Sequence, residues 1–450
     1  MPLVPEAIFA GLDPQGIVLV AVSGGSDSLA LLLLANAWAQ PKAITLHAVT
    51  IDHGLRPEAA AEAAFVAAVC DGLGIDHTTL AWDGIKPPTG LAQAARQARY
   101  ALIEDFALDI GCDLVLAGHT ADDQNETVLM RVRRLGLESG PAKRSLGRGL
   151  AGMARQSVLP GGTVMARPLL GISRQRLRIY LGSFPQSWVE DPTNLDVTYE
   201  RVRIRQELSA APALADAVAG FSNTMLRWRT LLSRDAAVLL SHHAAVKPGP
   251  VLRFDLDAAL AAPLPIVVHA IQVLLAVSGG GEHLAPRYKV EALAAGFASG
   301  DTGRMTLAGA VVERDGTGLR FYRELRHIDS CFVETGETVL WDGRMEIANG
   351  GRARMHVGPL TKAGLAEIEK MRNGPVAGRP RACLHSSPII RSGDGKVFLP
   401  MLENEGQPPL VHTRITARAI EHFCPQSDFA LLDWLRGIEV ARRACLMPRA

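Results

Sequence analysis

The sequence has no run of about eighteen uncharged apolar residues, the length that a membrane-spanning helix needs, although 48% of its 450 residues are hydrophobic. Its beginning, MPLVPEAIFAGLDPQG, lacks the basic segment that opens a signal peptide. Cysteine is scarce, and the 6 cysteines lie far apart and form no C-x-x-C pair, which argues against a zinc or dithiol site. These absences predict a cytoplasmic protein with reduced thiols and no membrane partner.

Net charge is also small, at +1, which argues against a protein that coats nucleic acid in general. The basic residues are nevertheless clustered, at 131–155, at 167–178 and just beyond 200. Such clusters attract polyanions and predict one basic groove for nucleic acid. For any single arginine, a solvated surface position is the simpler interpretation. The contacts that we predict are Arg131, Arg133, Arg134, Arg201, Arg203 and Arg205.

A loop rich in glycine and hydroxyl groups, Ser23-Gly24-Gly25-Ser26-Asp27-Ser28, joins the first predicted strand to the first predicted helix. The glycines allow a tight turn and a close approach to a ligand, and the following helix points free N–H groups and the positive end of its dipole at the loop. A plain turn is the alternative, but the added hydroxyls favour a phosphate site. Because the loop lacks the lysine of a Walker A motif, the backbone and a metal ion have to neutralise more of the phosphate charge.

Strands and helices alternate through the first part of the chain. Predicted strands at 17–22, 44–51, 76–82 and 113–119 alternate with predicted helices at 27–39, 57–74, 90–111 and 120–134. Buried strands in this alternation predict an α/β fold with a doubly wound, Rossmann-like parallel sheet. Ligands of such sheets bind at the carboxyl ends of the strands, where the glycine loop, Asp52-His53 and Gly118-His119 all lie. The sequence therefore predicts one active site at that edge.

Two further regions follow the predicted sheet. Residues from about 210 to about 330 have the pattern of long helices with short strand-like pieces, and the rest has short strands punctuated by glycine. We therefore predict a catalytic domain at 1–210, a mostly helical domain at 211–330 and a small β-rich α+β domain at 331–450. The loop Ser278-Gly279-Gly280-Gly281 lacks the Asp-Ser of the first glycine loop and is predicted to end a helix.

The second informative motif is GHTADDQNET, residues 118–127. Thr120 and Asp123 have the spacing of a capping box. Acids in the first turn of a helix also interact favourably with the helix dipole, and this is the only role that we expect for Asp122. Asp123 and Glu126 lie three residues apart and therefore share a helix face. The spacing alone leaves open whether that face is functional or only a cap. It also leaves open whether His119 is more than an ordinary residue at a strand end.

Taken together, the motifs resemble those of a known family. Ser23 to Ser28 is similar to the SGGxDS pyrophosphate loop of N-type ATP pyrophosphatases. Further matching stretches follow in order at 50–56, 95–100, 118–127, 149–153, 167–170 and 188–194. Over the first 205 residues the chain resembles the tRNA(Ile)-lysidine synthase family of bacteria. The helical middle and the β-rich end resemble that family's two C-terminal domains more loosely, which implies that both bind tRNA.

The resemblance implies an ATP-dependent ligase that joins L-lysine to the wobble cytidine of tRNA(Ile) with anticodon CAU. The carbonyl oxygen of the cytidine attacks the α-phosphate of ATP and releases diphosphate. The ε-amine of lysine then attacks the activated carbon, and AMP leaves. The product, lysidine, pairs with A instead of G.

The same resemblance assigns roles to residues. Asp123 and Glu126 are implied as the lysine-binding acids, and a carboxylate pair suits an amine that is mostly protonated at neutral pH, with a pKa near ~10.4. Mg²⁺ is expected, with Asp27 as the candidate to hold it directly or through water. Arg99 and His119 complete the predicted catalytic set with these acids. The ATP-binding residues are Ser23, Gly24, Gly25, Ser26, Asp27, Ser28, Asp52 and His53.

Two segments depart from the family pattern, and two other functions stay open. RRLGLESGPAKRSLGR, 133–148, is longer than the family's Arg-Gly-x-Gly, and Val202 stands where the family often has Asn; both are expected on the tRNA side. One rival is a tRNA 2-thiolation enzyme with the same ATP loop, but Cys70 and Cys112 lie in helix-like stretches away from the strand ends. The other is a non-catalytic tRNA- or nucleotide-binding module, which the intact motifs disfavour. The sequence also leaves a homodimer open.

Overall fold

The structure is a computed structural model that describes residues 2–55, 57–137, 148–190, 196–247, 251–300, 302–316, 318–371, 373–376, 381–395, 397–400, 411–421 and 424–446. Arg56, residues 191–194 of the motif that begins at Trp188 and residues 138–147 of the long basic segment lie outside the described residues. The described chain divides into two compact units. The first holds the residues up to 228 with 424–426, and the second holds 229–421 with 427–446. The division into three domains near 210 and 330 stays a prediction.

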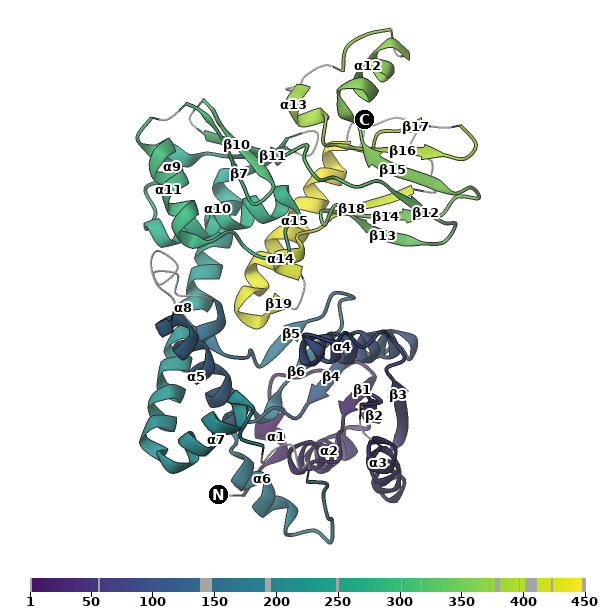
Figure 1. Ribbon diagram of the computed structural model, residues 1–450, viewed down its shortest axis with the longest axis vertical. Helices are drawn as coiled ribbons and strands as arrows, with labels where there is room; N and C mark the ends of the chain where they lie inside the picture. Colours follow the sequence, from purple (N-terminus) through teal and green to yellow (C-terminus); the bar gives the residue numbers. More distant parts are fainter. Residues whose placement is uncertain are drawn as a thin grey trace. The chain divides into compact units, whose positions relative to one another are not determined.

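The core of the first unit is a seven-stranded sheet with the order β19-β5-β6-β4-β1-β2-β3 (Figure 1). The predicted parallel arrangement is confirmed for β1 (Ile17–Ala21), β2 (Thr45–Asp52), β3 (Asp76–Ala81), β4 (Leu114–Ala117) and β6 (Val164–Ala166). At one edge, β5 (Gln156–Val158) and β19 (Cys424–Pro425) add antiparallel strands that the sequence did not indicate.

Alternate residues of each strand point to opposite faces of the sheet, so each face has its own core. Val18 and Val20 pack with α2 (Ser26–Ala39), α3 (Ala59–Leu73) and α6 (Arg174–Leu181). Leu19 and Val49 pack on the other face with α4 (Leu91–Asp109). Figure 1 shows α4 on one side of the strands and α2 and α3 on the other. The predicted helices are thus confirmed to within a few residues.

Two helices extend the first unit beside the sheet. The helix α5 (Ala121–Leu137) packs on α7 (Glu200–Ala210) through a small apolar cluster that includes Val128 and Ile204. The short elements of this unit are α1 (Pro5–Ile8), η1 (Gln40–Lys42), η3 (Arg148–Ala151) and η4 (Pro168–Gly171). The long helix α8 (Pro212–His243) begins in the first unit and continues into the second. The contact between α5 and α7 brings acids and arginines together.

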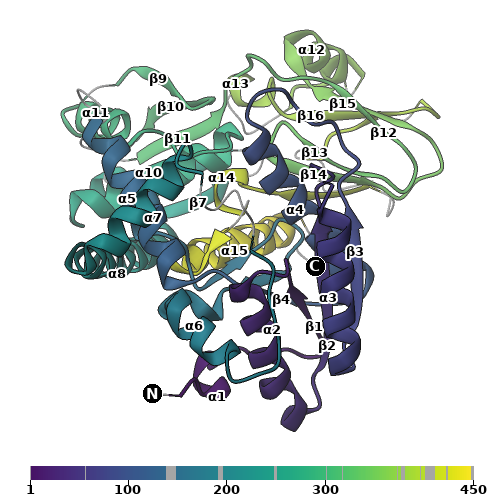
Figure 2. The same cartoon turned by 60° about the horizontal axis from the view of Figure 1, so that its bottom comes forward.

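The second unit begins with a helical layer on a five-stranded antiparallel sheet of order β7-β8-β11-β10-β9. Its helices are α9 (Leu256–Ala259), α10 (Leu264–Gly279) and α11 (Arg287–Ala298), and α10 packs on β10 and β11 (Figure 2). Its strands are β7 (Ala244–Lys247), β8 (Val251–Phe254), β9 (Arg304–Leu307), β10 (Ala310–Asp315) and β11 (Gly318–Arg323). The strand-like pieces noted in the sequence therefore form a sheet, and α10 ends at the Ser278–Gly281 loop as predicted.

The remainder of the second unit is β-rich, as predicted. One sheet holds β12 (Cys331–Val333), β15 (Met355–Pro359), β16 (Pro388–Ser392) and β17 (Val397–Phe398), and another holds β13 (Thr338–Trp341), β14 (Met345–Asn349) and β18 (Val411–Ile415). Its helical elements are α12 (Thr361–Met371), α13 (Arg381–Leu384), α14 (Arg418–Glu421), η6 (Gln426–Asp428) and α15 (Phe429–Leu446).

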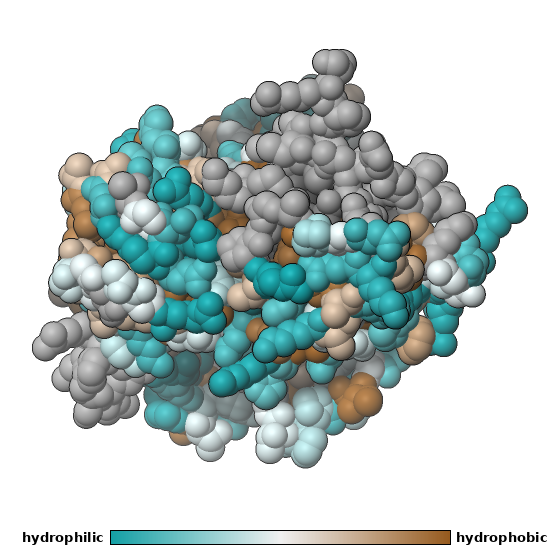
Figure 3. Space-filling model, turned by 90° about the horizontal axis from the view of Figure 1, so that it is seen from above, coloured by the Kyte–Doolittle hydropathy of each residue, from teal (hydrophilic) through white to brown (hydrophobic). Residues whose placement is uncertain are grey.

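None of the described helices is both long and apolar enough to cross a bilayer. Figure 3 shows one face of the molecule, where, outside the grey atoms, hydrophilic residues prevail and hydrophobic ones are scattered among them. Scattered apolar residues of this kind are normal on a protein surface and indicate no binding site.

Candidate active site

The carboxyl ends of the parallel strands gather polar residues at one edge of the first unit's sheet. The glycine loop follows β1, His53 follows β2 and His119 lies beyond β4, so the predicted co-location at this edge is confirmed. The structure adds Trp82 after β3 and Arg167 after β6. The strand-end argument could have found Trp82, but β6 is too short to be recognised in the sequence, and Arg167 was missed as a site residue.

The glycine loop is shaped by its own hydroxyl groups. The Ser28 hydroxyl accepts from the Ser23 N–H at 3.1 Å and donates to the Gly25 carbonyl at 3.0 Å. Gly24 has φ +83°, and a Cβ there would lie 3.3 Å from Val189 Cγ2, so a side chain at this position is strained. Helix α2 begins directly after Gly25 with no side-chain cap. Its first N–H groups are therefore available to an anion.

Gly118 lets the end of β4 approach this helix. A Cβ at Gly118 would lie 3.1 Å from the Ser28 Cα and 3.3 Å from the Asp27 carbonyl oxygen. Contacts this short with backbone atoms cannot be relieved by turning a side chain. Gly118 therefore holds the two predicted motifs against each other.

Asp27 carries the carboxylate of the glycine loop. Burial raises its pKa, although the neighbouring Arg174 acts in the opposite direction. The Arg174 Nε donates to Asp27 Oδ2 at 2.8 Å, and the Ser26 hydroxyl donates to Asp27 Oδ1 at 3.3 Å. Arg174 was missed in the sequence, because nothing in its surroundings distinguishes it from the other arginines of α6.

Asp123 makes the predicted capping box and more. Its Oδ2 accepts from both the N–H and the hydroxyl of Thr120 at 2.9 Å, and the Asp123 N–H donates back to the Thr120 hydroxyl at 3.4 Å. Its Oδ1 instead accepts from Arg201 at 2.7 Å and from Arg174 at 3.3 Å. Burial alone would raise the pKa of Asp123, but the two arginines and Thr120 outweigh it and lower the pKa. Oδ2 of Asp123 therefore caps the helix, and Oδ1 of the same carboxylate belongs to the charged site.

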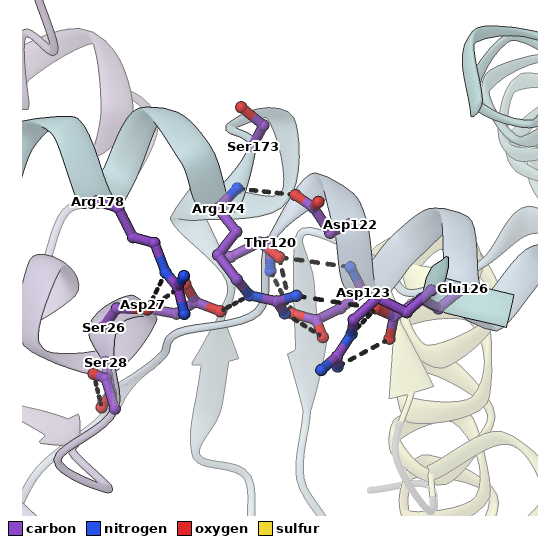
Figure 4. A network of polar contacts seen from close by, with 12 residues as sticks. Ser26, Asp27, Ser28, Thr120, Asp122, Asp123, Glu126, Ser173, Arg174 and Arg178 are labelled. Carbon is purple, nitrogen blue, oxygen red and sulfur yellow. Dashed lines mark hydrogen bonds and ion pairs between the residues drawn. The ribbon is translucent and has the colours of Figure 1, made fainter. Parts of the chain in front are cut away.

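Glu126 is the most deeply buried acid of the edge, with 1% of its side chain exposed. The Arg201 Nε donates to its Oε2 at 2.6 Å, and the Arg205 Nε donates to its Oε1 at 2.7 Å. The nitrogen of Arg174 that lies nearest to it is 3.9 Å away. Figure 4 shows Arg174 between Asp27 and Asp123, with Glu126 beyond. Arg174 is thus the arginine that the three acids share.

Asp122 has a different role from the one that we expected. Its Oδ2 accepts from the backbone N–H of Arg174 at 2.8 Å, at the first residue of α6. The prediction that Asp122 serves only its own helix dipole is therefore wrong. It joins the start of α6 to the start of α5 and so sets where the Arg174 side chain begins. Sequence spacing could not show this contact, because 52 residues separate the two partners.

The six arginines that we predicted to contact tRNA have partners within the first unit. Arg201 pairs with Asp123 and Glu126, and Arg205 pairs with Glu126. Arg133 pairs with Glu207 at 2.5 Å and Arg134 with Glu200 at 2.8 Å, both exposed on the surface. The remaining two donate to backbone carbonyl groups: Arg131 to Gly149 at 2.6 Å, and Arg203 to Val197 at 2.8 Å and Thr198 at 2.7 Å. Their contact with tRNA stays a prediction.

Asp52 and His53 differ in how they face the edge. Asp52 Oδ1 accepts from the Gly54 N–H at 2.7 Å, which fixes its own turn. His53 Nε2 lies 3.1 Å from Arg99, and its Nδ1 is buried without a partner. Burial and then the Arg99 charge lower the pKa of His53. The ring of Trp82 meets that of His53 edge-on, with centroids 6.0 Å apart.

His119 is held neutral. Burial and then the charges of Arg167 and Arg96 lower its pKa to about 3, and its Nδ1 has no partner. Burial also lowers the pKa of Arg167, whose side chain is almost fully enclosed. Near neutral pH, His119 therefore offers hydrogen bonds without adding charge.

Comparisons with known proteins cover most of the chain. Residues 6–211 match the PP-loop domain family. A tRNA(Ile)-lysidine synthase from Brucella anthropi is 35% identical over an alignment of 471 positions, which covers 98% of each chain. A tRNA(Ile)-lysidine synthase from Brucella melitensis is 36% identical, and the alignment covers 96% of each chain. Among solved structures, a U34-tRNA thiolase from Methanococcus maripaludis is 16% identical with a TM-score of 0.38, over 49% of this chain and 78% of that one.

Proposed function

Because the chain belongs to the tRNA(Ile)-lysidine synthase family, we propose that it joins L-lysine to the wobble cytidine of tRNA(Ile) with anticodon CAU. ATP activates the cytidine, and AMP and diphosphate are released. The observation that best supports this proposal is the acid pair of α5 beside the glycine loop, with guanidinium groups on its carboxylate oxygens. A protein that modifies tRNA is expected to act in the cytoplasm. A homodimer stays a prediction.

The first half of the reaction needs a cradle for the phosphates of ATP. The uncapped start of α2 and the backbone of the glycine loop suit diphosphate, and catalysis of phosphoryl transfer is mainly positioning and charge neutralisation. In nucleotide sites, Mg²⁺ takes one or two carboxylates and completes its coordination with phosphate oxygens and water. Asp27 offers one carboxylate, and no cluster able to cage a metal occurs in the described part of the chain. The residues therefore fit a Mg²⁺ ion that ATP brings, which would neutralise phosphate charge.

The second half needs a site for the ammonium groups of lysine. Asp123 and Glu126 fit this role, because cationic nitrogens already lie within 2.7 Å of their oxygens. A lysine ammonium offers these carboxylates the same charge and donor type. Since the pKa of Asp123 is lowered, this carboxylate is better suited to hold and orient an ammonium group than to accept its proton. His119 lies at the start of the same segment and adds no competing charge.

The thiolation alternative finds less support in the first unit. Such an enzyme needs reactive cysteines at the strand ends. Cys70 is buried on α3, and burial raises the pKa of its thiol to about 11. Cys112 was expected in a helix but follows α4, and it lies before β4, at the opposite end of the strand from His119. Burial raises the pKa of this thiol as well, so neither cysteine is poised to react.

A transfer assay tests the proposal. The full chain is incubated with ATP, Mg²⁺, radiolabelled L-lysine and a tRNA(Ile) transcript with anticodon CAU. Label should enter the RNA in an ATP-dependent manner. A matched transcript with uridine at the wobble position should take up none. Sulfur incorporation instead of lysine would favour the thiolation enzyme, and tight tRNA binding without either reaction would favour a binding module.

A further inference from the structure

The carboxyl edge has a positive half as well as an acidic one. Arg96 and Arg99 lie three residues apart on α4, and Arg167 follows β6. Among the described residues, none of the three forms an ion pair with an acid. Arg99 instead contacts His53, and the Arg96 guanidinium lies 4.9 Å from the centre of the Tyr100 ring. This contrasts with Asp123 and Glu126, whose carboxylate oxygens all have cationic or capping partners.

Arg167 is built firmly into this positive half. Only 3% of it is exposed, and its Nη1 donates to the Ala154 carbonyl and the Ser157 hydroxyl, both at 3.0 Å. It also forms a hydrogen bond with the Tyr100 side chain, which supports the ring beneath Arg96. Its Nε is buried without a partner. A buried cation without a counter-charge is costly, and an anionic ligand would relieve that cost.

His119 lies where the two halves meet. It follows β4, which pairs with the strand β6 that precedes Arg167. The charges of Arg96 and Arg167 lower the pKa of its ring, and the charge of Asp123 raises it. The Nδ1 atom of this largely buried ring has no hydrogen-bond partner. A neutral imidazole that carries its proton on Nδ1 can donate to an oxyanion. The segment that supplies the acids thus also supplies an unpaired imidazole nitrogen.

On the premise of the proposed ligase function, we propose that Arg96, Arg167 and His119 Nδ1 form the subsite for the α-carboxylate of the amino-acid substrate. Lysine carries ammonium groups and one carboxylate, so its site needs an acidic and a basic half. Two other arginines lie at the glycine loop, where the phosphates of ATP are expected: Arg174 contacts Asp27, and Arg178 contacts the Ser26 hydroxyl at 3.5 Å. The positive half next to the acids is therefore left for the carboxylate. Arg167 and Tyr100 position Arg96 for this contact.

Lysinamide, in which a neutral amide replaces the carboxylate, is the probe for this subsite. Equilibrium titration of the full chain with L-lysine and with lysinamide gives two dissociation constants that do not depend on RNA transfer. The wild-type chain should bind lysinamide about ten- to a hundred-fold more weakly, the range that one charge-assisted hydrogen bond provides. Arg96→Met should weaken L-lysine binding by a similar factor and leave lysinamide binding unchanged. Arg96→Lys should recover part of the loss, because it restores the charge without the planar fork.

The neighbouring Gln97→Met serves as the matched control, because it changes the same exposed turn of α4 and should alter neither constant. Equal losses for L-lysine and lysinamide in Arg96→Met would overturn the proposal and indicate a structural role. A slower lysine-independent adenylation of RNA in Arg96→Met, with lysine binding unchanged, would assign the arginine to a phosphate instead. If the wild-type chain binds L-lysine better than lysinamide but transfers none to RNA, the ligase function fails while the carboxylate subsite stands.

Discussion

Each unit contains a buried network of arginines and acids, and the two networks differ in how completely their hydrogen bonds are satisfied. In the second unit, Arg323 and Arg344 share Asp342, with contacts of 3.0 Å and 2.6 Å. The two arginines also donate to backbone carbonyl groups, Arg323 to that of Gly309 and Arg344 to that of Ser386. This network is closed, and it joins the end of β11 to the turn between β13 and β14.

At the carboxyl edge of the first unit, the network is open. Arg201 is 44% exposed although it pairs with two buried acids. The Nδ1 atoms of His53 and His119 and the Nε atom of Arg167 are buried without partners. Buried charge is therefore a poor marker of function by itself. At this edge, unpaired nitrogens beside the charge distinguish the network from the closed one around Asp342.

The strongest test of this contrast exchanges one acid in each network for its amide. Asp27→Asn should reduce ATP-dependent adenylation of RNA by about a hundred- to a thousand-fold, because one charged group is lost where charge develops. Its melting temperature should change little, since burial already raises the pKa of Asp27 and Arg174 keeps Asp123 and Glu126 as partners. The adenylation rate and the melting temperature are measured on the same preparation of the variant. Normal adenylation would remove Asp27 from the site.

Asp342→Asn should show the opposite pattern. Among the described residues, Asp342 is the only carboxylate that Arg323 and Arg344 contact, so its loss should destabilise the second unit by about 3–5 kcal/mol. Its backbone has φ +52°, a conformation that asparagine tolerates, so strain does not add to the effect. Adenylation per folded molecule should stay unchanged. A stable but inactive variant would contradict the distinction between the two networks.

The surface arginines of α5 provide a smaller effect. The double change Arg133→Ala with Arg134→Ala should weaken tRNA binding and reduce the slope of log K against log salt by about 0.7 to 0.9 for each lost phosphate contact. Glu207→Gln is the matched control, because it frees Arg133 from its ion pair and should steepen the slope slightly. The slopes are obtained by measuring tRNA binding at several salt concentrations for the wild type, the double variant and Glu207→Gln. Identical slopes for all three proteins would mean that these arginines only solvate the surface.

The smallest effect concerns pH and stability. His119 has a pKa of about 3 in the folded chain, whereas an unfolded histidine titrates near 6.5, so only the unfolded chain takes up this proton as pH falls below about 6.5. This lowers the free energy of unfolding on acidification. His119→Gln should therefore lose about 1 kcal/mol less stability than the wild type between about pH 7 and about pH 5.5. Parallel pH dependences in denaturant melts would show that His119 is not held neutral.

Much of the first unit follows from its sequence, because local signals and global fold agree there. Apolar runs bounded by glycine fix β1, β2 and β4, and the parallel sheet then brings their ends together. The strands β5 and β6 were missed because they contain only three residues each, and β19 because its partner lies more than 250 residues away in the chain. No local pattern specifies such a pairing.

The candidate site was predictable where a motif fixes the spacing and not where distant segments meet. The capping geometry of Asp123 follows from its distance to Thr120 along the chain. The roles of Arg174 and Arg201 depend on where α6 and α7 pack, and the sequence alone made Arg201 a surface contact for tRNA. The same limit explains Asp122, whose partner lies on another helix. A charge count along the chain cannot show which arginines turn inward.

The acids of α5 are proposed to act on lysine after ATP has activated the RNA. The most direct test is a single-turnover experiment with α-labelled ATP and tRNA(Ile) with anticodon CAU, in which Glu126→Gln is compared with the wild type. The variant should form adenylated RNA at the normal rate and accumulate it, and the lysine concentration needed for transfer should rise about ten- to a hundred-fold. Asp123→Asn should behave similarly but also lower the melting temperature, because it weakens the cap of α5. Normal lysine dependence in both variants, or a block before adenylation, would contradict the account.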